Sequence, residues 1–482
     1  MKKKNILRVI IAFILCFTTA LSLFACGGGN GGNNNEPQTE GTLEFDEKGN
    51  VKFSNVSLKL ETVVAGEDKD AFNDIINKFN VAYRNKIRIS VTNTTAGSFE
   101  DTVGKKITNK TNAPDIIMSH QKSHKNFEKN KLIQPLNETM TASKINIDLS
   151  SYADGLSKYS DLGNAGKIYS IPCDGQSMVF IYNKKELAKT GKQLPTTRAE
   201  LLEVCKAYKE ATNNMPIAWS TGADYFANYT YFTAVLQNGA TLYNEDTYTT
   251  DWYDNKTNLA AIKNATKSIN ELIELGYAGY NQAKANNQSA FNAGNRLFYL
   301  LEPWSLVETL NAYSEIKKVT VDEVISDYVG GTTCQGWFAM SDNEHKNDIY
   351  GDSHFFAMTM TVTDINKKAA ILEFINWFNS NVDTGKDWAR AGHISMSKTI
   401  ADDAEYKGDV YVSDFLAKFY PDVNNFRCIG NTPYYAEITN NLKSVFSQTV
   451  KGKGAAPSEA VMESAIKGAQ NAVNNTIGWI EG

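Results

Sequence analysis

VSLKLETVVAGEDKDAFNDIINKFNVAYRNKIRISVTNTTAGSFEDTVGKKITNKTNAPDIIMSH, residues 56–120, is the stretch that decides the fold. Apolar and polar residues alternate over 56–64 and over 86–94, which predicts two strands. Apolar residues then recur with helical spacing over 68–83 and over 98–110, and a short apolar run at 115–119 predicts a third strand. Strands that alternate with helices pair in parallel, so this stretch predicts an α/β lobe.

The carboxyl ends of these three strands are rich in polar residues. In open α/β sheets, ligands bind beyond those ends. The sequence places Gly66-Glu67, Thr94-Thr95 and His120-Gln121-Lys122 there. We therefore expect a ligand site at this edge of the sheet.

Further elements follow along the chain, without an internal repeat. A strand is predicted at 178–182 and another at 355–362. The apolar spacing predicts helices over 198–212, 258–275 and 365–379, and a mostly helical tail over 435–480 that is broken at Gly452-Lys453-Gly454.

The N-terminal residues have the pattern of a secretory signal. Four basic residues precede an apolar run from Val9 to Ala25. Leu23-Phe24-Ala25-Cys26 resembles the bacterial lipoprotein signal, in which the cysteine is lipidated and becomes the new N-terminus. We expect a signal peptide at 1–25, a lipid on Cys26 and a Gly/Asn-rich flexible linker at 26–50 with a reach of about 25 Å. A plain signal peptide or an uncleaved anchor is the alternative.

Composition limits the class of protein. The 482 residues are too many for one ordinary core, so two or three lobes are expected. The formal charge is −5, and it would be about −9 after loss of the four leader cations, which argues against a nucleic-acid partner. Four cysteines remain after Cys26, and their spacing leaves buried thiols and disulfides equally open: Cys173, Cys205, Cys334 and Cys428.

The search for catalytic and cofactor motifs finds none. HExxH, Walker, G-x-S-x-G and dinucleotide-binding patterns are all absent from the sequence. His120 and His124 stand four apart without an evident third ligand, so we expect solvated histidines and no metal site. The adjacent Tyr434 and Tyr435 are similar to the tyrosines of ferric-binding proteins but lack the matching ligands. No cofactor and no enzymatic activity are expected.

Aromatic residues beside polar ones and turns are the most suggestive feature. A flat aromatic face with polar neighbours suits a sugar ring, although such residues also serve as core packing. The residues concerned are Trp219, Tyr225, Phe226, Trp304, Trp337, Tyr434 and Tyr435.

Ordered motifs over most of the chain resemble the extracellular solute-binding proteins of ABC carbohydrate importers, the family that includes maltose-binding protein. The motifs are Ala113–His120, Gly166–Pro172, Ile181–Lys184, Ala223–Phe226, Ala290–Gly294 with Glu302-Pro303-Trp304, and Pro433–Ala436. Each is weak alone, and their order and spacing together are specific. Ser119 stands where the family's maltose binder has a tryptophan, which favours a glycan other than maltose.

The resemblance implies an α/β, two-lobed periplasmic-binding-protein fold (Venus flytrap) with a hinge between the lobes. The first lobe would take residues 53–168 and 352–400, and the second 169–351 and 401–482. Trp304, Tyr434 and Tyr225 would stack on sugar rings, with Trp337 as a weaker candidate. Hydroxyl groups would be bound by Glu67, Asp68, His120, Gln121, Asp174, Gln176 and Asp224.

By the same resemblance, the protein would be a monomer that binds an oligosaccharide and delivers it to an ABC permease. It would act on the extracellular face of the cell membrane of a Gram-positive bacterium, held by its lipid. The alternatives are a surface glycan sensor or adhesin, and a glycoside hydrolase that uses Asp174 and Asp224 as its carboxylate pair. A peptide or a polyol-phosphate ligand also remains open.

Overall fold

A computed structural model describes residues 39–66, 68–223 and 225–481, which belong to one compact unit. The signal sequence, Cys26, Glu67 and Asp224 lie outside the described residues, so the expectations for them stay predictions. Although the sequence predicts a flexible linker up to residue 50, Glu40 already exchanges backbone hydrogen bonds with Thr363 and Ile365. The described end of the predicted linker is therefore part of the folded unit.

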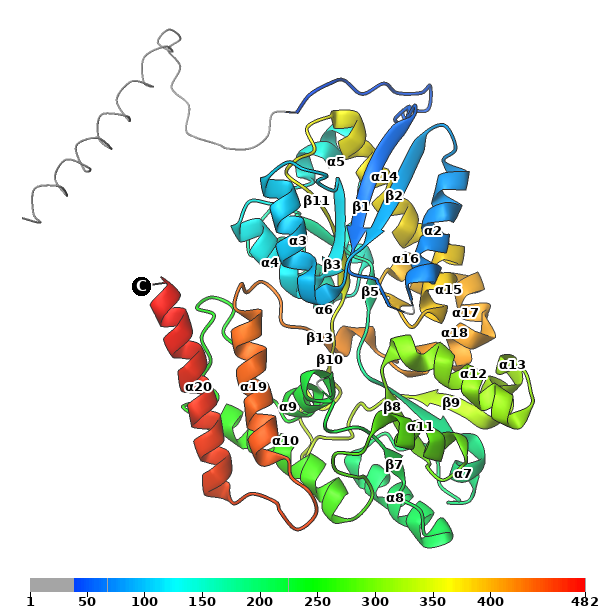
Figure 1. Cartoon of the computed structure of the whole chain (residues 1–482), viewed down its shortest axis with the longest axis vertical. Coiled ribbons are helices and arrows are strands. Elements are labelled where there is room, and N and C mark those ends of the chain that lie inside the picture. The colour runs from blue at the N-terminus through cyan, green and yellow to red at the C-terminus, as the bar shows by residue number, and fades with distance from the viewer. Residues whose placement is uncertain (1–38, 67, 224, 482) are drawn as a thin grey trace, which may run out of the picture. The chain divides into compact units, whose positions relative to one another are not determined.

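A five-stranded sheet forms the centre of the first lobe (Figure 1), in the order β2-β1-β3-β11-β4. β1 (Val56–Thr62) pairs in parallel with β2 (Ile87–Asn93) and with β3 (Ile116–His120). β11 (His354–Met358) is antiparallel to both β3 and β4 (Ser170–Pro172). The parallel order predicted from the N-terminal stretch is confirmed.

Helices cover both faces of this sheet. α2 (Lys69–Ala82) and α14 (Ile365–Ser380) pack against one face, with apolar side chains in a common core. α3 (Ala96–Thr108) and α4 (Gln121–Lys129) contribute to the core on the other face, where they meet Ile117. Burial on both faces explains why β3 and β11 read as nearly continuous apolar runs.

The second lobe has a four-stranded sheet in the order β7-β8-β6-β9. β6 (Val179–Asn183) lies antiparallel between β8 (Phe298–Leu301) and β9 (Val329–Thr332), and β7 (Ile217–Ala218) extends the sheet parallel to β8. The antiparallel pairing brings the carboxyl end of β8 beside the start of β6, close to where the chain arrives from the first lobe.

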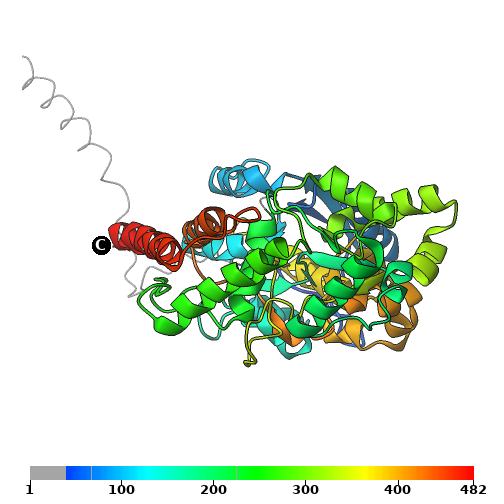
Figure 2. The same ribbon diagram turned by 90° about the horizontal axis from the view of Figure 1, so that it is seen from below.

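Long helices bury the faces of the second sheet. α8 (Arg198–Thr212), α10 (Lys256–Glu274) and α19 (Tyr435–Thr449) share one core, and α12 (Leu306–Lys317) packs on the opposite face. α20 (Glu459–Glu481) packs along α19, as Figures 1 and 2 show.

Short strand pairs connect the two sheets. β5 (Asp174–Gly175) pairs with β12 (Ile394–Ser395), and β10 (Ile349–Tyr350) pairs with β13 (Phe426–Arg427). The chain passes from the first sheet to the second after β4, returns before β11, and leaves the first lobe again after β12. The two-lobed fold with hinge segments, which the resemblance implied, is confirmed.

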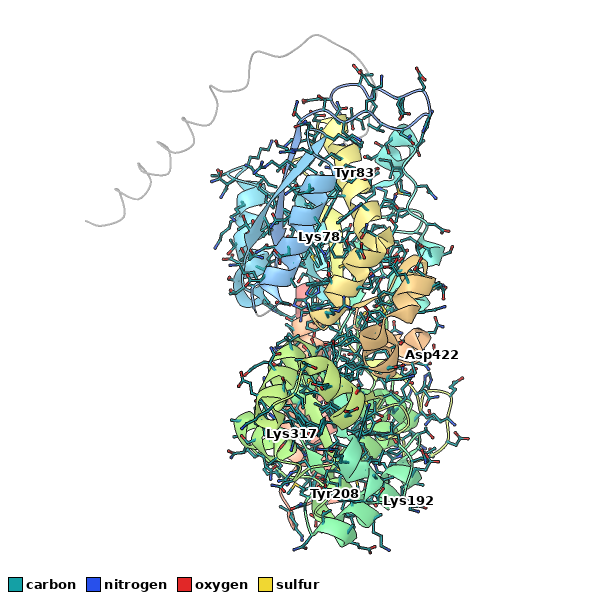
Figure 3. All side chains as sticks on the ribbon, turned by 90° about the vertical axis from the view of Figure 1, so that its right-hand side faces the viewer. Lys78, Tyr83, Lys192, Tyr208, Lys317 and Asp422 are labelled. Carbon is teal, nitrogen blue, oxygen red and sulfur yellow. The ribbon has the colours of Figure 1, made fainter. Side chains whose placement is uncertain are left out.

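The other α-helices lie in the connections between these elements. They are α5 (Asn137–Ser143), α6 (Asp154–Ser157), α7 (Lys184–Ala188), α9 (Phe232–Gln237), α11 (Lys284–Asn292), α13 (Val321–Glu323), α15 (Val382–Arg390), α16 (Lys398–Ala401), α17 (Ala404–Gly408) and α18 (Val410–Asp414). Figure 3 labels Lys78 of α2, which forms an ion pair with Asp387 of α15.

Local signals set the helix ends. Thr197 and Glu200 form a reciprocal capping box at the start of α8, and Asn213 ends that helix in the left-handed region at φ 56°. The predicted bounds of α8 are therefore confirmed. The predicted break in the tail is confirmed as well, because α19 ends at Thr449 and α20 starts at Glu459.

All four cysteines after Cys26 are free and buried, so the disulfide alternative is wrong for this structure. Among the described residues, no helix has both the length and the apolar character of a membrane span.

Candidate functional site

A groove of about 580 Å³ lies between elements of the two lobes. Asp68, just before α2, lines it from the first lobe, and Trp304, just after β8, lines it from the second. The indole of Trp304 is partly exposed there. The other lining residues are Ala71, Val307, Glu308, Asn311, Ala312, Glu315, Asp387, Arg390 and Ala391.

Tyr225 does not line this groove but forms a polar contact with Glu302 beside the turn that carries Trp304. Glu302 is buried at the end of β8, two residues before Trp304, and its carboxylate lies 3.2 Å from Lys284 Nζ. Burial and a hydrogen bond to Glu302 raise the pKa of Tyr225, so its hydroxyl stays protonated and donates. The contact ties the ring of Tyr225 to the turn that carries Trp304.

A second polar cluster joins the first lobe to the hinge. Asp352 Oδ2 lies 3.2 Å from Lys122 Nζ and 3.1 Å from His120 Nδ1. Burial raises the pKa of Asp352, but Lys122 and His120 outweigh it and hold that pKa well below its usual range. Asp352 is thus a buried, charged carboxylate beside the predicted residue His120.

The two predicted glutamines lie beside this cluster. Gln176 exchanges backbone hydrogen bonds of 2.9 and 2.8 Å with Asp352, and these bonds pair the two hinge segments. The side chain of Gln121 is fully buried, and neither of its amide atoms has a hydrogen-bond partner among the described residues. It packs against Gly430, where an added Cβ would come within 2.7 Å of Gln121 Nε2.

Asp174 is fully buried and accepts hydrogen bonds from several donors. Its Oδ1 accepts the backbone N–H of His354 at 2.7 Å, and its Oδ2 lies 2.8 Å from His354 Nδ1. Trp388 Nε1 donates to the same Oδ2 at 2.9 Å, and His393 Nδ1 lies 3.3 Å away. Burial raises the pKa of Asp174, but His354 and His393 outweigh it and keep the carboxylate charged.

His393 lies between two carboxylates. Its Nε2 is 2.9 Å from Asp68 Oδ2, and its ring stacks on Trp388 with centroids 4.0 Å apart and planes 7° apart. Burial lowers the pKa of His393, but the contacts with Asp174 and Asp68 outweigh it and raise that pKa to about 9. The imidazole is therefore charged at neutral pH.

Asp174, His354 and His393 are the described residues whose donor atoms gather closely enough to hold a metal ion, all within 4.8 Å. Their residue types suit zinc. However, Asp174 already accepts N–H donors on both oxygens, and a doubly protonated His393 has no lone pair for a metal. The cluster fits a hydrogen-bonded network better than a metal site.

Tyr434 and Trp337 are more enclosed than stacking platforms would be. Tyr434 is buried, packs on Tyr248 with centroids 5.8 Å apart, and has Lys129 Nζ 5.4 Å above its ring. Trp337 has no exposed surface, packs against Phe180, and donates its Nε1–H to a backbone oxygen of the same lobe. In this conformation Trp337 offers no face to a ligand.

The expectation of solvated histidines at 120 and 124 is wrong. His124 is fully buried, lies 3.0 Å from Ser119 Oγ, and has its pKa lowered by burial to about 3. His120 is the N-cap residue of α4 and His124 lies within that helix, where they contact Asp352 and Phe355, which are distant in sequence.

The sequence analysis missed the buried residues that contact the predicted site residues His120 and Asp174. Asp352, His354, Trp388 and His393 are distant in sequence from the groups they contact. No local motif could have identified them. Glu302 could have been found, because it precedes the Pro303-Trp304 turn that the resemblance selected.

Comparisons with known proteins place the chain in a family. Residues 65–384 match the model of the family described as bacterial extracellular solute-binding protein, and the chain belongs to this family. As that description says, its members are solute-binding proteins. No curated protein sequence matches the chain.

Solved structures of binding proteins for sugars and for glycerophosphocholine share the fold. The sugar-binding protein MalE from Xanthomonas citri aligns with a TM-score of 0.69 and 16% identity, over 88% of this chain and 99% of that chain. The cyclic alpha-maltosyl-1,6-maltose binding protein from Arthrobacter globiformis aligns at 0.64 and 17%, over 88% and 99%. UgpB from Mycobacterium tuberculosis, in complex with glycerophosphocholine, aligns at 0.61 and 15%, over 88% and 100%.

Proposed function

We propose that the protein is the lipid-anchored binding component of an ABC importer, which captures an oligosaccharide in the interlobe groove and delivers it to a membrane permease. The observation that carries this proposal is the shared groove of Asp68 and Trp304, which come from different lobes. An aromatic face and a carboxylate are the two groups that suit the apolar face and the hydroxyl rim of a sugar.

Binding would be coupled to closure of the lobes. A ligand that touches both Asp68 and Trp304 gains its full set of contacts only when the lobes are together, so it shifts the population toward the closed form. Each hydrogen bond from a sugar hydroxyl to a carboxylate would contribute about 1.5–3 kcal/mol. A tether on Cys26 would keep the closed complex at high local concentration beside its permease.

The charges around the groove favour a neutral ligand over an anionic one. Among the described residues, Asp68, Glu308, Glu315, Asp387 and the cation Arg390 line it. Arg390 pairs with Asp409, Asp387 with Lys78 and Asp68 with His393, so the excess negative charge comes from Glu308 and Glu315. A phosphodiester would be repelled by these carboxylates, because like charges at close range are unfavourable in a partly desolvated groove. This supports a neutral sugar over an anionic polyol phosphate.

Binding without chemistry is the simplest use of these groups. A glycosidase needs one carboxyl group with a raised pKa to act as the acid. Asp174, one member of the carboxylate pair weighed for hydrolysis, instead has a lowered pKa and accepts N–H donors on both oxygens. The proposal therefore assigns it a structural role beneath the groove.

Titration calorimetry of residues 27–482 with maltose, maltotetraose, tagatose and glycerophosphocholine tests the proposal. Saturable binding of a sugar, with the sugar recovered intact by chromatography after long incubation, is the expected result. Binding of glycerophosphocholine alone would reject the carbohydrate assignment, and shortened glycan products would favour the hydrolase.

Release of a Cys26→Ala variant into the medium would support the anchor.

A further inference from the structure

Asp68 occupies an N-terminal cap position but does not use its carboxylate as a cap. Aspartate at this position of a helix usually accepts a hydrogen bond from an amide N–H of the first turn. Within the described chain, Asp68 precedes α2 and makes no such side-chain bond. Its Oδ2 is instead 2.9 Å from His393 Nε2. The contact with His393 therefore decides where this carboxylate points.

His393 is itself held on its ring face and at Nε2, and a second carboxylate lies beside Nδ1. Trp388 stacks on the ring face, Asp174 lies 3.3 Å from Nδ1, and Asp68 lies at Nε2. His354, whose ring centroid is 5.3 Å away, is the other titratable group against it. These neighbours come from α15, β5, the residue before α2, and β11. An imidazole held from four elements is a rigid support.

The side chain of Asp68 remains 13% exposed, whereas that of His393 is 1% exposed. Of the three side chains Asp174, His393 and Asp68, only Asp68 therefore lines the groove beside Trp304. A ligand could touch Asp68 but not the imidazole behind it.

We propose that His393 is a positioning residue that orients the Asp68 carboxylate toward the interlobe groove beside Trp304. This inference rests on the proposed function, because it assumes that the groove receives the ligand. The Nε2–H of a charged His393 donates to Asp68, and the Asp174 carboxylate lies 3.3 Å from Nδ1, where it stabilises the charge of the ring. Loss of one proton removes the ring charge, weakens the attraction between His393 and Asp68, and allows Asp68 to rotate toward its cap position.

The first test needs no ligand. In protein labelled with ¹⁵N-histidine, one imidazole should remain doubly protonated at neutral pH and titrate near pH 9. That signal should disappear in His393→Gln and titrate at lower pH in Asp68→Asn. In His393→Ala the ¹³C-labelled carboxyl of Asp68 should titrate about one pH unit higher, because its cationic partner is gone. An ordinary midpoint for His393, or an unchanged Asp68, would overturn the proposal.

The second test follows maltotetraose affinity at pH 7 and pH 10. Wild-type affinity should fall by about tenfold, the size of one charge-assisted hydrogen bond. His393→Gln keeps an N–H donor that cannot titrate, so its affinity should change little over this range. His345→Gln, at an exposed histidine paired with Asp348, should keep the wild-type profile.

The outcomes of the two tests separate the inference from the proposed function. Equal pH profiles for wild type and His393→Gln would overturn the positioning role. A wild-type protein that binds no sugar at either pH would reject the proposed function. In that case the histidine and carboxyl titrations would still decide whether His393 holds Asp68.

Discussion

Lys122 Nζ lies 4.8 Å from the centre of the Tyr435 ring, so a cation of the first lobe contacts an aromatic ring of the second. The same ammonium group lies 3.2 Å from Asp352 Oδ2 in the hinge. A cation over an aromatic ring contributes about 0.5–2 kcal/mol, depending on its solvation. This contact joins the described parts of the two lobes.

Replacement of Lys122 by methionine should lower the free energy of unfolding by about 3 kcal/mol, because it leaves Asp352 charged and buried without its partner. Urea unfolding measures the loss. The matched double variant Lys122→Met with Asp352→Asn should recover part of it, since the unpaired charge is removed. Equal losses in the single and the double variant would show that the pair does not carry the effect.

Trp304→Ala should weaken sugar binding by about 2 kcal/mol, as truncation of a central aromatic anchor does. Calorimetry with the best-bound glycan measures this change. Trp479→Ala is the matched control, because that indole is 85% exposed on α20. An affinity of the folded Trp304→Ala variant equal to that of Trp479→Ala would remove Trp304 from the site.

Trp337→Ala should act on stability. The indole is fully buried against Phe180 and Phe298, and truncation of a buried aromatic costs about 3–5 kcal/mol. Urea unfolding should show this loss. A variant with wild-type stability that has lost only its affinity for sugar would return Trp337 to the list of ligand-binding residues.

Gly392→Ala should disturb the contact between the segment before β12 and the turn before Trp304. Gly392 has φ +97°, and an added Cβ would lie 2.5 Å from the backbone oxygen of Pro303. Gly166→Ala is the matched control, since Gly166 has φ +81° with nothing within 4 Å of the added Cβ. Both variants carry backbone strain of about 1–3 kcal/mol.

The difference between the two glycine variants therefore isolates the contact with Pro303. We expect Gly392→Ala to be the less stable variant in urea unfolding and to lose sugar affinity, whereas Gly166→Ala should bind normally. Indistinguishable unfolding curves and affinities would contradict the proposed importance of this contact.

Stability should depend on the protonation of His393. Its pKa of about 9 in the folded protein exceeds the ordinary value of 6.5, so its contribution is fully present below pH 6.5 and is lost as pH rises through 9. The urea midpoint of wild type should therefore fall from pH 7 to pH 10 by more than that of His393→Gln. Parallel curves for the two proteins would contradict the raised pKa.

Local residue patterns were enough to predict β1, β2 and β3, the helices between them and their parallel pairing. The alternation over residues 56–64 and the helical spacing over 68–83 lie within single elements, so neighbours in sequence carry the whole signal. The capping pair Thr197 and Glu200 set the start of α8 in the same way. The motifs around Trp304 identified the family for a similar reason, because each is a short continuous run.

Only the tertiary structure decided which side chains form the site and in what state. Trp304 and Trp337 look alike in sequence, yet one lines the groove and the other fills a core, since burial depends on elements far away along the chain. Asp68 and His393 are 325 positions apart, so their contact exists only after the first lobe has folded. That contact keeps His393 protonated and orients the carboxylate of Asp68. Charge and burial are properties of an assembled environment, and no local pattern encodes them.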